Sequence, residues 1–343
     1  MSTDFTWRDA GRTVVFRGGG VGAGVEVLRE QGVEEYELLS TPRALAGAEA
    51  LAAAASAVHE VKSGQVPAAA AALLDALVPP SHAEEGVRVR PLVALGGGRV
   101  IDVAKAVASV SGAAVVAVPT TMSGAEMTGS HRLPEGSEGR VRGMVRPGLV
   151  IADPEAMTSQ PEEQLRASSM NALAHGADTL YLPLSNPVSE MTALRGAALI
   201  ARSLDSEPPL RSPEDLALGS LFCAYAIDSA GMGMHHLVCQ SLVRFCGTPH
   251  AETNAAVLPC SLAFLSEQAP EQYGRLASAL DTELLDLPER VKELGRPPGL
   301  GSVGGDRERL GDAVEAMLQR PELQRVPRPP TRGELFDLVE RAW

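Results

Sequence analysis

Three consecutive glycines, Gly96 to Gly98, stand between an apolar stretch that predicts a strand and one that predicts a helix. Glycine lets the backbone approach a ligand closely, and the free N–H groups at the start of a helix attract phosphate. Asp102 falls in the first turns of the expected helix. These residues predict a turn that cradles the phosphates of a nucleotide. A second glycine turn at 18–20 predicts either a further cofactor contact or a simple chain reversal.

Hydroxyl residues end two other expected strands. Thr120 and Thr121 follow one of them, and Ser40 and Thr41 end the other. In an open sheet with helical crossovers, ligands bind at the carboxyl ends of the strands. In many NAD-binding sheets, an acidic residue at the end of the second strand binds the ribose. Here Thr41 stands at that position and no acidic residue is beside it, so NADH and NADPH both remain possible cofactors. The candidate cofactor-binding residues are Ser40, Thr41, Gly97, Gly98, Asp102, Thr120, Thr121 and Gly124.

Histidines gather in the second half of the chain. Asn171 and His175 are four residues apart and share one face of a predicted helix. His236 and His250 are separated by a Gly-Thr-Pro sequence that ends a helix between them. We expect these four side chains to share one pocket, with His235 as a neighbour that does not face inward.

The expected pocket is a poor metal site. A divalent metal ion prefers neutral imidazoles together with a carboxylate. The fourth member of this set is Asn171, whose amide is a weaker ligand, and Asp178 is only a distant substitute. A nucleotide site combined with such an imidazole pocket predicts a dehydrogenase.

The elements that must position these residues differ between the two halves. Up to about residue 150, apolar runs alternate with helix-like segments, which indicates parallel strands joined by helices. Strands are expected at 13–16, 36–39, 91–95, 114–118 and 149–154, and helices at 22–31, 44–61, 68–77 and 100–110. Further helices are expected at 168–183, 188–204, 213–229, 231–246 and 254–266, and Thr331 should cap a final helix.

The predicted fold class is therefore an α/β domain with a parallel, Rossmann-like sheet, followed by an all-α domain. We place the nicotinamide dinucleotide-binding domain at 1–155 and the helical substrate domain at 156–343. The substrate is expected between the two domains, a common location for such sites.

Composition excludes several other classes of protein. The net charge of −13 disfavours binding to nucleic acid. No basic leader and no apolar window of about 18 residues is present, so we expect a cytoplasmic protein without a membrane span. The four cysteines form no CxxC pair, which favours buried, reduced thiols.

These motifs together resemble the iron-containing (group III) alcohol dehydrogenase superfamily, and within it the maleylacetate reductase branch. The resemblance covers nearly the whole chain. The matching segments are Ser40-Thr41-Pro42, the GGG-x-x-x-D-x-A-K run at 96–105, Pro119-Thr120-Thr121, Gly124 to Thr128, Met170-Asn171-Ala172, His235-His236 and Leu258-Pro259.

The resemblance implies a dehydroquinate synthase-like architecture, a homodimer and a role in the catabolism of aromatic compounds. It also implies NADH or NADPH as cofactor and a dicarboxylate or oxo-acid substrate, with maleylacetate reduced to 3-oxoadipate. In metal-using members of the superfamily, the positions that correspond to Asn171, His175, His236 and His250 hold the ion. The maleylacetate reductase branch has Asn at the first of these, and is thought to need no metal. The expected catalytic residues are His236, His250, His175 and Asn171.

The chain departs from the family on the substrate side. A histidine common in metal-using members is Gln240 here, and the loop at 129–142 is altered. His131 is a candidate for approaching the substrate, and Arg132, Arg142 and Arg244 are candidates for binding its carboxylates. Two alternatives stay open: an iron- or zinc-dependent alcohol or polyol dehydrogenase, and a non-redox lyase or pseudoenzyme of a biosynthetic pathway.

Overall fold

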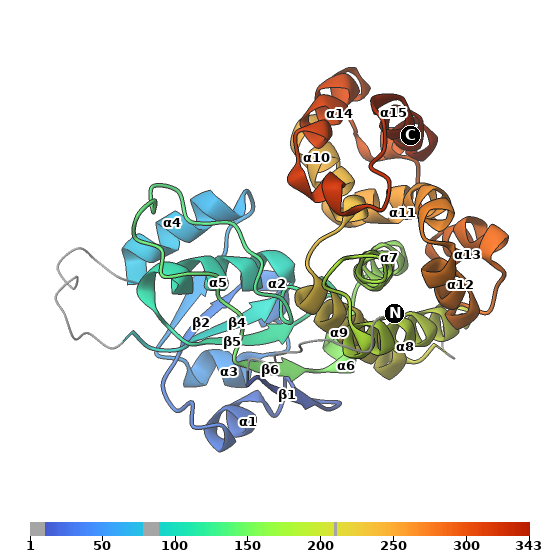
Figure 1. Ribbon diagram of the computed structural model, residues 1–343. Coiled ribbons are helices and arrows are strands. Elements are labelled where there is room, and N and C mark those ends of the chain that lie inside the picture. Colours follow the sequence, from blue (N-terminus) through green and yellow to red (C-terminus); the bar gives the residue numbers. More distant parts are fainter. Residues whose placement is uncertain (1–10, 78–88, 209–210) are drawn as a thin grey trace. The chain divides into compact units, whose positions relative to one another are not determined.

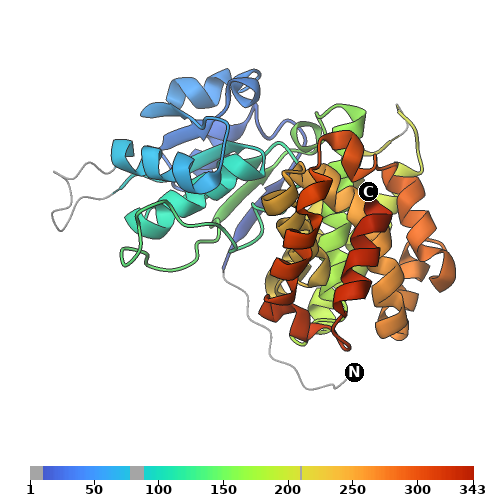
Figure 2. The same cartoon turned by 90° about the horizontal axis from the view of Figure 1, so that it is seen from above.

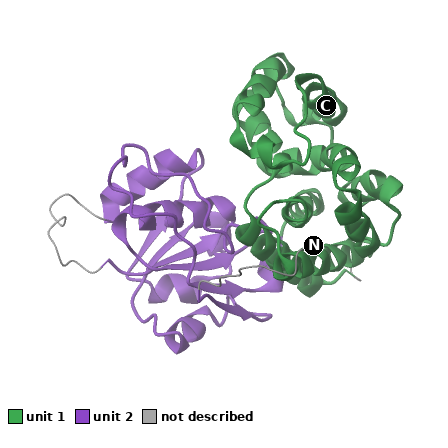
Figure 3. Cartoon of the chain, in the orientation of Figure 1, with its two compact units in different colours: residues 1–8, 160–343 green, residues 9–159 purple. Residues whose placement is uncertain are grey.

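The computed structural model describes residues 11–77, 89–208 and 211–343. The chain divides into two compact units, which contain residues 9–159 and 160–343 (Figure 3). The strands found among the described residues all belong to the first unit, and the second is built from helices.

Six parallel strands of the described chain form one sheet. They are β1 (Thr13–Phe16), β2 (Glu37–Ser40), β3 (Ala57–Glu60), β4 (Leu92–Gly96), β5 (Val115–Pro119) and β6 (Leu149–Ala152), in the spatial order β1-β6-β5-β4-β2-β3. The order reverses between β2 and β4, because β3 lies outside β2 while β5 and β6 lie beyond β4. Ligands bind open sheets at the carboxyl ends of strands beside such a reversal.

Helices cover both faces of this sheet (Figure 1). One face is covered by α4 (Val66–Leu77) and α5 (Gly98–Ser111), and the other by α1 (Gly24–Glu30) and α3 (Glu49–Ala54). The short helices α2 (Pro42–Leu45) and α6 (Pro154–Met157) follow β2 and β6 directly.

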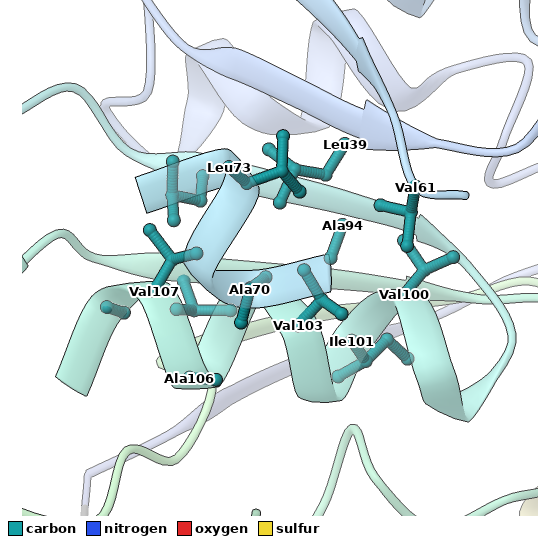
Figure 4. Close-up of a cluster of buried hydrophobic side chains, with 14 of the residues drawn as sticks. Leu39, Val61, Ala70, Leu73, Ala94, Val100, Ile101, Val103, Ala106 and Val107 are labelled. Atoms are coloured by element: carbon teal, nitrogen blue, oxygen red, sulfur yellow. The ribbon is translucent and has the colours of Figure 1, made fainter. Parts of the chain in front are cut away.

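The core of the first unit follows the alternation of side chains along the strands. Leu39 and Ala94 belong to the apolar cluster under α4 and α5, which also contains Ile101 (Figure 4). Leu38 and Val93, one position earlier on the same strands, belong to the cluster on the opposite face. The strands β2, β4, β5 and β6 are therefore buried on both sides, as is usual in parallel sheets, whereas the edge strands β1 and β3 are partly exposed.

The second unit is a helical bundle. Its α-helices are α7 (Glu162–Thr179), α8 (Pro187–Leu204), α9 (Pro213–Ala230), α10 (Met234–Cys246), α11 (His250–Gln268), α12 (Pro270–Ala279), α13 (Leu287–Gly295), α14 (Leu310–Leu318) and α15 (Arg332–Ala342). Single 3₁₀ turns lie at Leu284–Asp286, Leu300–Val303, Arg307–Arg309 and Pro321–Arg325. Helix α7 lies in the middle, in contact with α8, α9, α10, α11 and α13 (Figure 1), while α14 and α15 lie side by side (Figure 2).

Small residues allow the central helices to approach closely. A Cβ on Gly176 of α7 would lie 3.0 Å from Cys223 Sγ of α9, and one on Gly196 of α8 would lie 2.6 Å from the same sulfur. The four cysteines are free thiols: three are buried, and Cys260 is half-buried.

The predicted fold class is confirmed: a parallel α/β unit precedes a helical one. The helix predicted at 44–61 is wrong, because this segment forms α2, α3 and the strand β3. The alanines of this segment do not form a hydrophobic pattern with a period that would distinguish a helix from a strand. The capping role of Thr331 is confirmed, since its hydroxyl accepts a hydrogen bond from the N–H of Glu334.

Membrane-spanning potential is confined to one bent pair. No single described helix is long and apolar enough to cross a bilayer, and only α9 with α10, bent by 98°, meets the length and composition criteria together.

Candidate active site

Helix α7 carries three of the polar side chains of the candidate site. Every residue from 165 to 179 is buried, as expected for a helix at the centre of a bundle. Asn171, His175 and Asp178 follow one another at helical spacing and are exposed by 3%, 7% and 0%. Polar groups at such depth need hydrogen-bond partners, so their contacts carry the information about the site.

Helix α10 begins against Asp178. Its first residue follows Gly233, whose added Cβ would lie 2.6 Å from Asp178 Oδ1, so glycine is needed there. The backbone N–H groups of His235 and His236 donate to the carboxylate at 3.3 and 3.2 Å. Asp178 therefore caps α10, where a negative charge also meets the positive end of the helix dipole.

The same carboxylate holds the side chain of His236. Nδ1 of His236 lies 2.7 Å from Asp178 Oδ2. The His236 ring stacks on the ring of His175, with centroids 4.6 Å apart and planes within 8° of each other, while His235 meets it edge-on at 5.2 Å. The structure thus brings His175 and His236 together, from helices that lie far apart in the sequence.

Burial keeps these imidazoles neutral. Desolvation lowers the pKa of His236 to about 3, with His250 adding a smaller effect in the same direction. Desolvation and the neighbouring His236 hold the pKa of His175 well below its usual range. Burial raises the pKa of Asp178. His235 and the backbone N–H groups that donate to the Asp178 carboxylate oppose this rise in pKa.

His235 points into the helical core. Its Nδ1 lies 3.1 Å from Ser261 Oγ and its Nε2 lies 3.1 Å from Asn254 Oδ1. Because the amide oxygen of Asn254 can only accept, Nε2 carries the hydrogen and Nδ1 accepts from the serine hydroxyl. Both ring nitrogens of His235 are used inside the protein.

His250 stands at the first position of α11 and is exposed. Asn254, one turn later, donates to its carbonyl at 2.8 Å and lies 3.4 Å from its Nε2. Arg244 is also exposed, and its guanidinium lies over the ring of Phe245, two turns beyond His236 on α10.

The family resemblance implies a metal ion in many members, at the positions of Asn171, His175, His236 and His250. No group of three His, Cys, Asp or Glu side chains that could hold an ion occurs in the described residues. Asn171 contributes an amide where a carboxylate is needed. Asp178, expected as a distant substitute, instead faces Nδ1 of His236. The residues present do not fit a metal ion.

The candidate cofactor residues lie in the first unit, at the carboxyl ends of β2, β4 and β5. Gly97 is the N-cap of α5 and offers no side chain to it. A Cβ on Gly97 would lie 3.0 Å from Thr121 Cγ2, and one on Gly98 would lie 2.8 Å from Ser123 Oγ. The backbone at the start of α5 is therefore bare and closely lined by the segment after β5, as a phosphate cradle requires.

The other cofactor candidates contribute differently. Ser40 Oγ donates to the Leu95 carbonyl at 2.8 Å, and Thr41 Oγ1 accepts from the N–H of Ala44 as the cap of α2. Thr120 N–H donates to the carbonyl of Gly96, which joins the ends of β5 and β4. Gly124 has φ +78°, a left-handed conformation that suits glycine.

Two charged residues beside this edge, Lys105 of the glycine-rich run and Glu126, are buried, which their sequence does not predict. Lys105 is fully buried, and its Nζ donates to Asp102 Oδ1 at 2.8 Å and to the carbonyls of Ala125 and Ser130. Glu126 is also fully buried, neither carboxylate oxygen has a hydrogen-bond partner, and desolvation raises its pKa to about 7. Nothing in the local sequence distinguishes these residues from exposed charges, since long-range packing buries them.

The altered loop at 129–142 is held by contacts of its own. His131 Nε2 accepts from the N–H of Val145 and Nδ1 lies 3.1 Å from the Arg132 carbonyl, so the ring fastens the loop. Arg142 lies against Gly112, the cap at the far end of α5, on the amino-terminal edge of the sheet. Arg142, a candidate for binding a substrate carboxylate, therefore lies at the opposite edge of the sheet from the candidate cofactor residues.

Comparisons with known proteins agree across both units. Residues 19–161 match the model of the iron-containing alcohol dehydrogenases, and residues 166–343 match that of the C-terminal part of the Fe-containing alcohol dehydrogenase family. Maleylacetate reductase 1 of Rhodococcus opacus is 36% identical over 264 residues, which cover 74% of this chain and 72% of that protein. Maleylacetate reductase of Rhizobium sp. strain MTP-10005 is 31% identical over 358 residues, covering 99% and 97%. The crystal structure of maleylacetate reductase from Agrobacterium tumefaciens superposes with a TM-score of 0.84 at 27% identity, over 100% and 99% of the two chains.

Proposed function

The chain belongs to the iron-containing alcohol dehydrogenase family, and on this premise we propose that it is an NAD(P)H-dependent reductase of the maleylacetate reductase type. The reaction would reduce an activated C=C bond beside a ketone, as in the conversion of maleylacetate to 3-oxoadipate, or a related oxo-acid. The observation that carries the proposal is the buried His175–His236 pair. Within the described part of the chain, Nδ1 of His175 and Nε2 of His236 have no hydrogen-bond partner, and no carboxylate contacts these two atoms. The chain is also similar to maleylacetate reductases over almost its full length.

We assign the dinucleotide to residues 1–155. The bare start of α5 at Gly97 and Gly98 suits the phosphates, and the ends of β2, β4 and β5 would supply the remaining contacts, including Thr120, Thr121 and Gly124. When bound, NAD(P)H supplies the hydride.

We assign the substrate and the proton chemistry to residues 156–343. Hydride addition to the C=C bond builds negative charge on the oxygen of the neighbouring ketone. His236 or His250 would stabilise that charge or deliver a proton. His175 and Asn171 would orient the substrate. Arg244 stays a candidate for a substrate carboxylate, because its guanidinium is exposed.

We also propose that catalysis needs no metal, and the neutral donor set supports this. Finer assignments follow from the resemblance and belong to the proposal as well: a homodimer in the cytoplasm, either NADH or NADPH as donor, and a role in the catabolism of aromatic compounds.

One assay tests the proposal. Oxidation of NADH and of NADPH is followed by absorbance with maleylacetate and with a panel of small ketones and aldehydes, each with and without chelator. Turnover of maleylacetate that survives the chelator supports the proposal. Turnover of simple aldehydes that the chelator abolishes, with stoichiometric iron or zinc in the purified protein, would replace it with a metal-dependent alcohol dehydrogenase. Failure to bind either dinucleotide would indicate a non-redox lyase or a pseudoenzyme.

A further inference from the structure

Asp178 is surrounded by donors. Besides the N–H groups of His235 and His236 and the Nδ1 of His236, it accepts from the N–H of Gly233 and from the hydroxyl of Tyr181. The Tyr181 oxygen in turn accepts from the N–H of Met234 at 2.6 Å. A buried carboxyl group with several N–H donors is held as the anion, because each of these hydrogen bonds favours the charged form.

This charge decides where the imidazole carries its hydrogen. An ionised carboxylate can only accept, so in its 2.7 Å contact with Asp178 the ring nitrogen Nδ1 of His236 must donate. In the neutral ring Nε2 then has a lone pair and no hydrogen. That atom is buried and has no hydrogen-bond partner, so its lone pair stays available for a bound molecule.

The ring of His236 has little freedom to change this arrangement. His175 covers one of its faces at 4.6 Å, and His235 meets it edge-on. A half-turn of the ring about its Cβ–Cγ bond would place the carbon Cδ2 where Nδ1 now lies, and the contact with Asp178 would be lost. Gly233 contributes as well, since a Cβ there would lie 2.6 Å from Oδ1 and displace the carboxylate.

The geometry points to Asp178 as a positioning residue that fixes His236 in the tautomer with hydrogen on Nδ1, so that Nε2 meets the substrate as a hydrogen-bond acceptor. The substrate group that meets Nε2 in the resting site is then a donor, such as an enol or an alcohol hydroxyl. The proton of that hydroxyl moves to Nε2, where the adjacent carboxylate stabilises the imidazolium, and the imidazolium returns the proton to the enolate that hydride addition leaves. The effect on turnover rests on the proposed function, whereas the tautomer is a property of the free protein.

The first test is a nitrogen-15 NMR spectrum of the full-length, histidine-labelled protein after chelator treatment, with the His236→Gln variant for assignment. We expect His236 to show a protonated Nδ1 and an unprotonated Nε2. In Asp178→Asn, whose amide can donate as well as accept, a population with hydrogen on Nε2 should appear. A wild-type His236 with its hydrogen on Nε2 would overturn the inference, and this result does not depend on any substrate.

The second test compares Asp178→Asn with Tyr181→Phe. Both variants remove a group from the cap of α10, but only the first alters the contact with Nδ1 of His236. We expect Asp178→Asn to lower kcat by about 100-fold or more while the KM for NADH stays within about threefold, and Asp178→Glu to restore part of the loss. Tyr181→Phe should lower the melting temperature comparably but kcat by much less.

Other outcomes separate the possible failures. If Asp178→Asn and Tyr181→Phe lose kcat equally, and the loss is proportional to the fall in melting temperature, then Asp178 acts only as a structural cap of α10. If Asp178→Asn does not fold, the wild-type spectrum still decides the tautomer. If the wild-type protein reduces no member of the substrate panel, the proposed function fails, while the spectrum still tests the assignment of Asp178.

Discussion

The imidazole rings of His175 and His236 lie face to face, with centroids 4.6 Å apart and planes inclined by only 8°. Two positive charges at that distance in a buried site would repel strongly, so at most one of the rings can carry a proton charge at a time. Asp178 touches His236 and so selects it as the ring that can become charged. The pair therefore consists of two unequal members: His236 suits proton transfer, and His175 suits a neutral, orienting contact.

Replacement of His236 by alanine should lower kcat by about 100-fold or more, because proton transfer by a positioned side chain contributes at least that factor. The affinity for NADH should stay near normal, since the dinucleotide is assigned to the other unit. Steady-state kinetics and a fluorescence titration measure the two quantities separately. His59→Ala in the strand β3 is the matched histidine control and should keep full turnover; an unchanged rate in His236→Ala would remove its catalytic role.

His235 should make the protein sensitive to acid. Desolvation lowers its pKa in the folded protein to about 3, from the ordinary value of about 6.5. Below pH 6.5 the unfolded chain takes up a proton that the folded one does not, so stability falls as the pH falls from about 6.5 towards 3. His235→Gln should flatten this slope by about 1.4 kcal/mol per pH unit.

Urea unfolding at pH values between 4 and 7 measures this slope. Ser261→Ala is the control, because it removes the hydroxyl that donates to Nδ1 but keeps the imidazole, and it should lower stability almost equally at every pH. Parallel curves for His235→Gln and the wild-type protein would contradict the prediction.

The sequence predicts the architecture well where patterns are local. Apolar runs locate the strand at 13–16, and the glycine triplet marks the start of α5 correctly. The prediction from sequence fails at β3, because the segment is rich in alanine and has no strand pattern. This strand is stabilised by its pairing with β2. Four-residue spacing relates Asn171 to His175, but the partnership of Asp178 with His236 joins residues 58 positions apart and leaves no local signal.

Glu126 should make the protein less stable as the pH rises from about 4.5 to about 7. Burial raises its pKa from the ordinary value of about 4.5 to about 7, so the folded protein holds a proton that the unfolded chain releases above pH 4.5. The stability present below pH 4.5 is lost as the pH rises through about 7. The stability of Glu126→Gln relative to the wild-type protein should therefore improve by about 3 kcal/mol between pH 4 and pH 8.

Denaturant midpoints at the two pH values check this expectation. Glu135→Gln, an exposed carboxylate of the same loop, is the control and should show no such change. If Glu126→Gln and the wild-type protein differ by the same amount at both pH values, then Glu126 is charged in both states and a partner must satisfy it.

Substitution of Gly98 by alanine should weaken dinucleotide binding. The added Cβ would lie 2.8 Å from both Cβ and Oγ of Ser123, so the start of α5 and the segment after β5 must move apart. Overpacking of this kind costs about 1–3 kcal/mol, and about 1.4 kcal/mol corresponds to a tenfold change in affinity. Gly148→Ala, before the start of β6 in the same unit, is the matched control, because a Cβ there meets nothing within 4 Å. Fluorescence titration with NADH and NADPH should show a rise in Kd of about tenfold for Gly98→Ala and almost none for Gly148→Ala. The double variant Gly98→Ala/Ser123→Gly, which removes the obstructing side chain, should recover most of the affinity. Equal Kd values for Gly98→Ala and the wild-type protein would show that the phosphates do not bind at this turn.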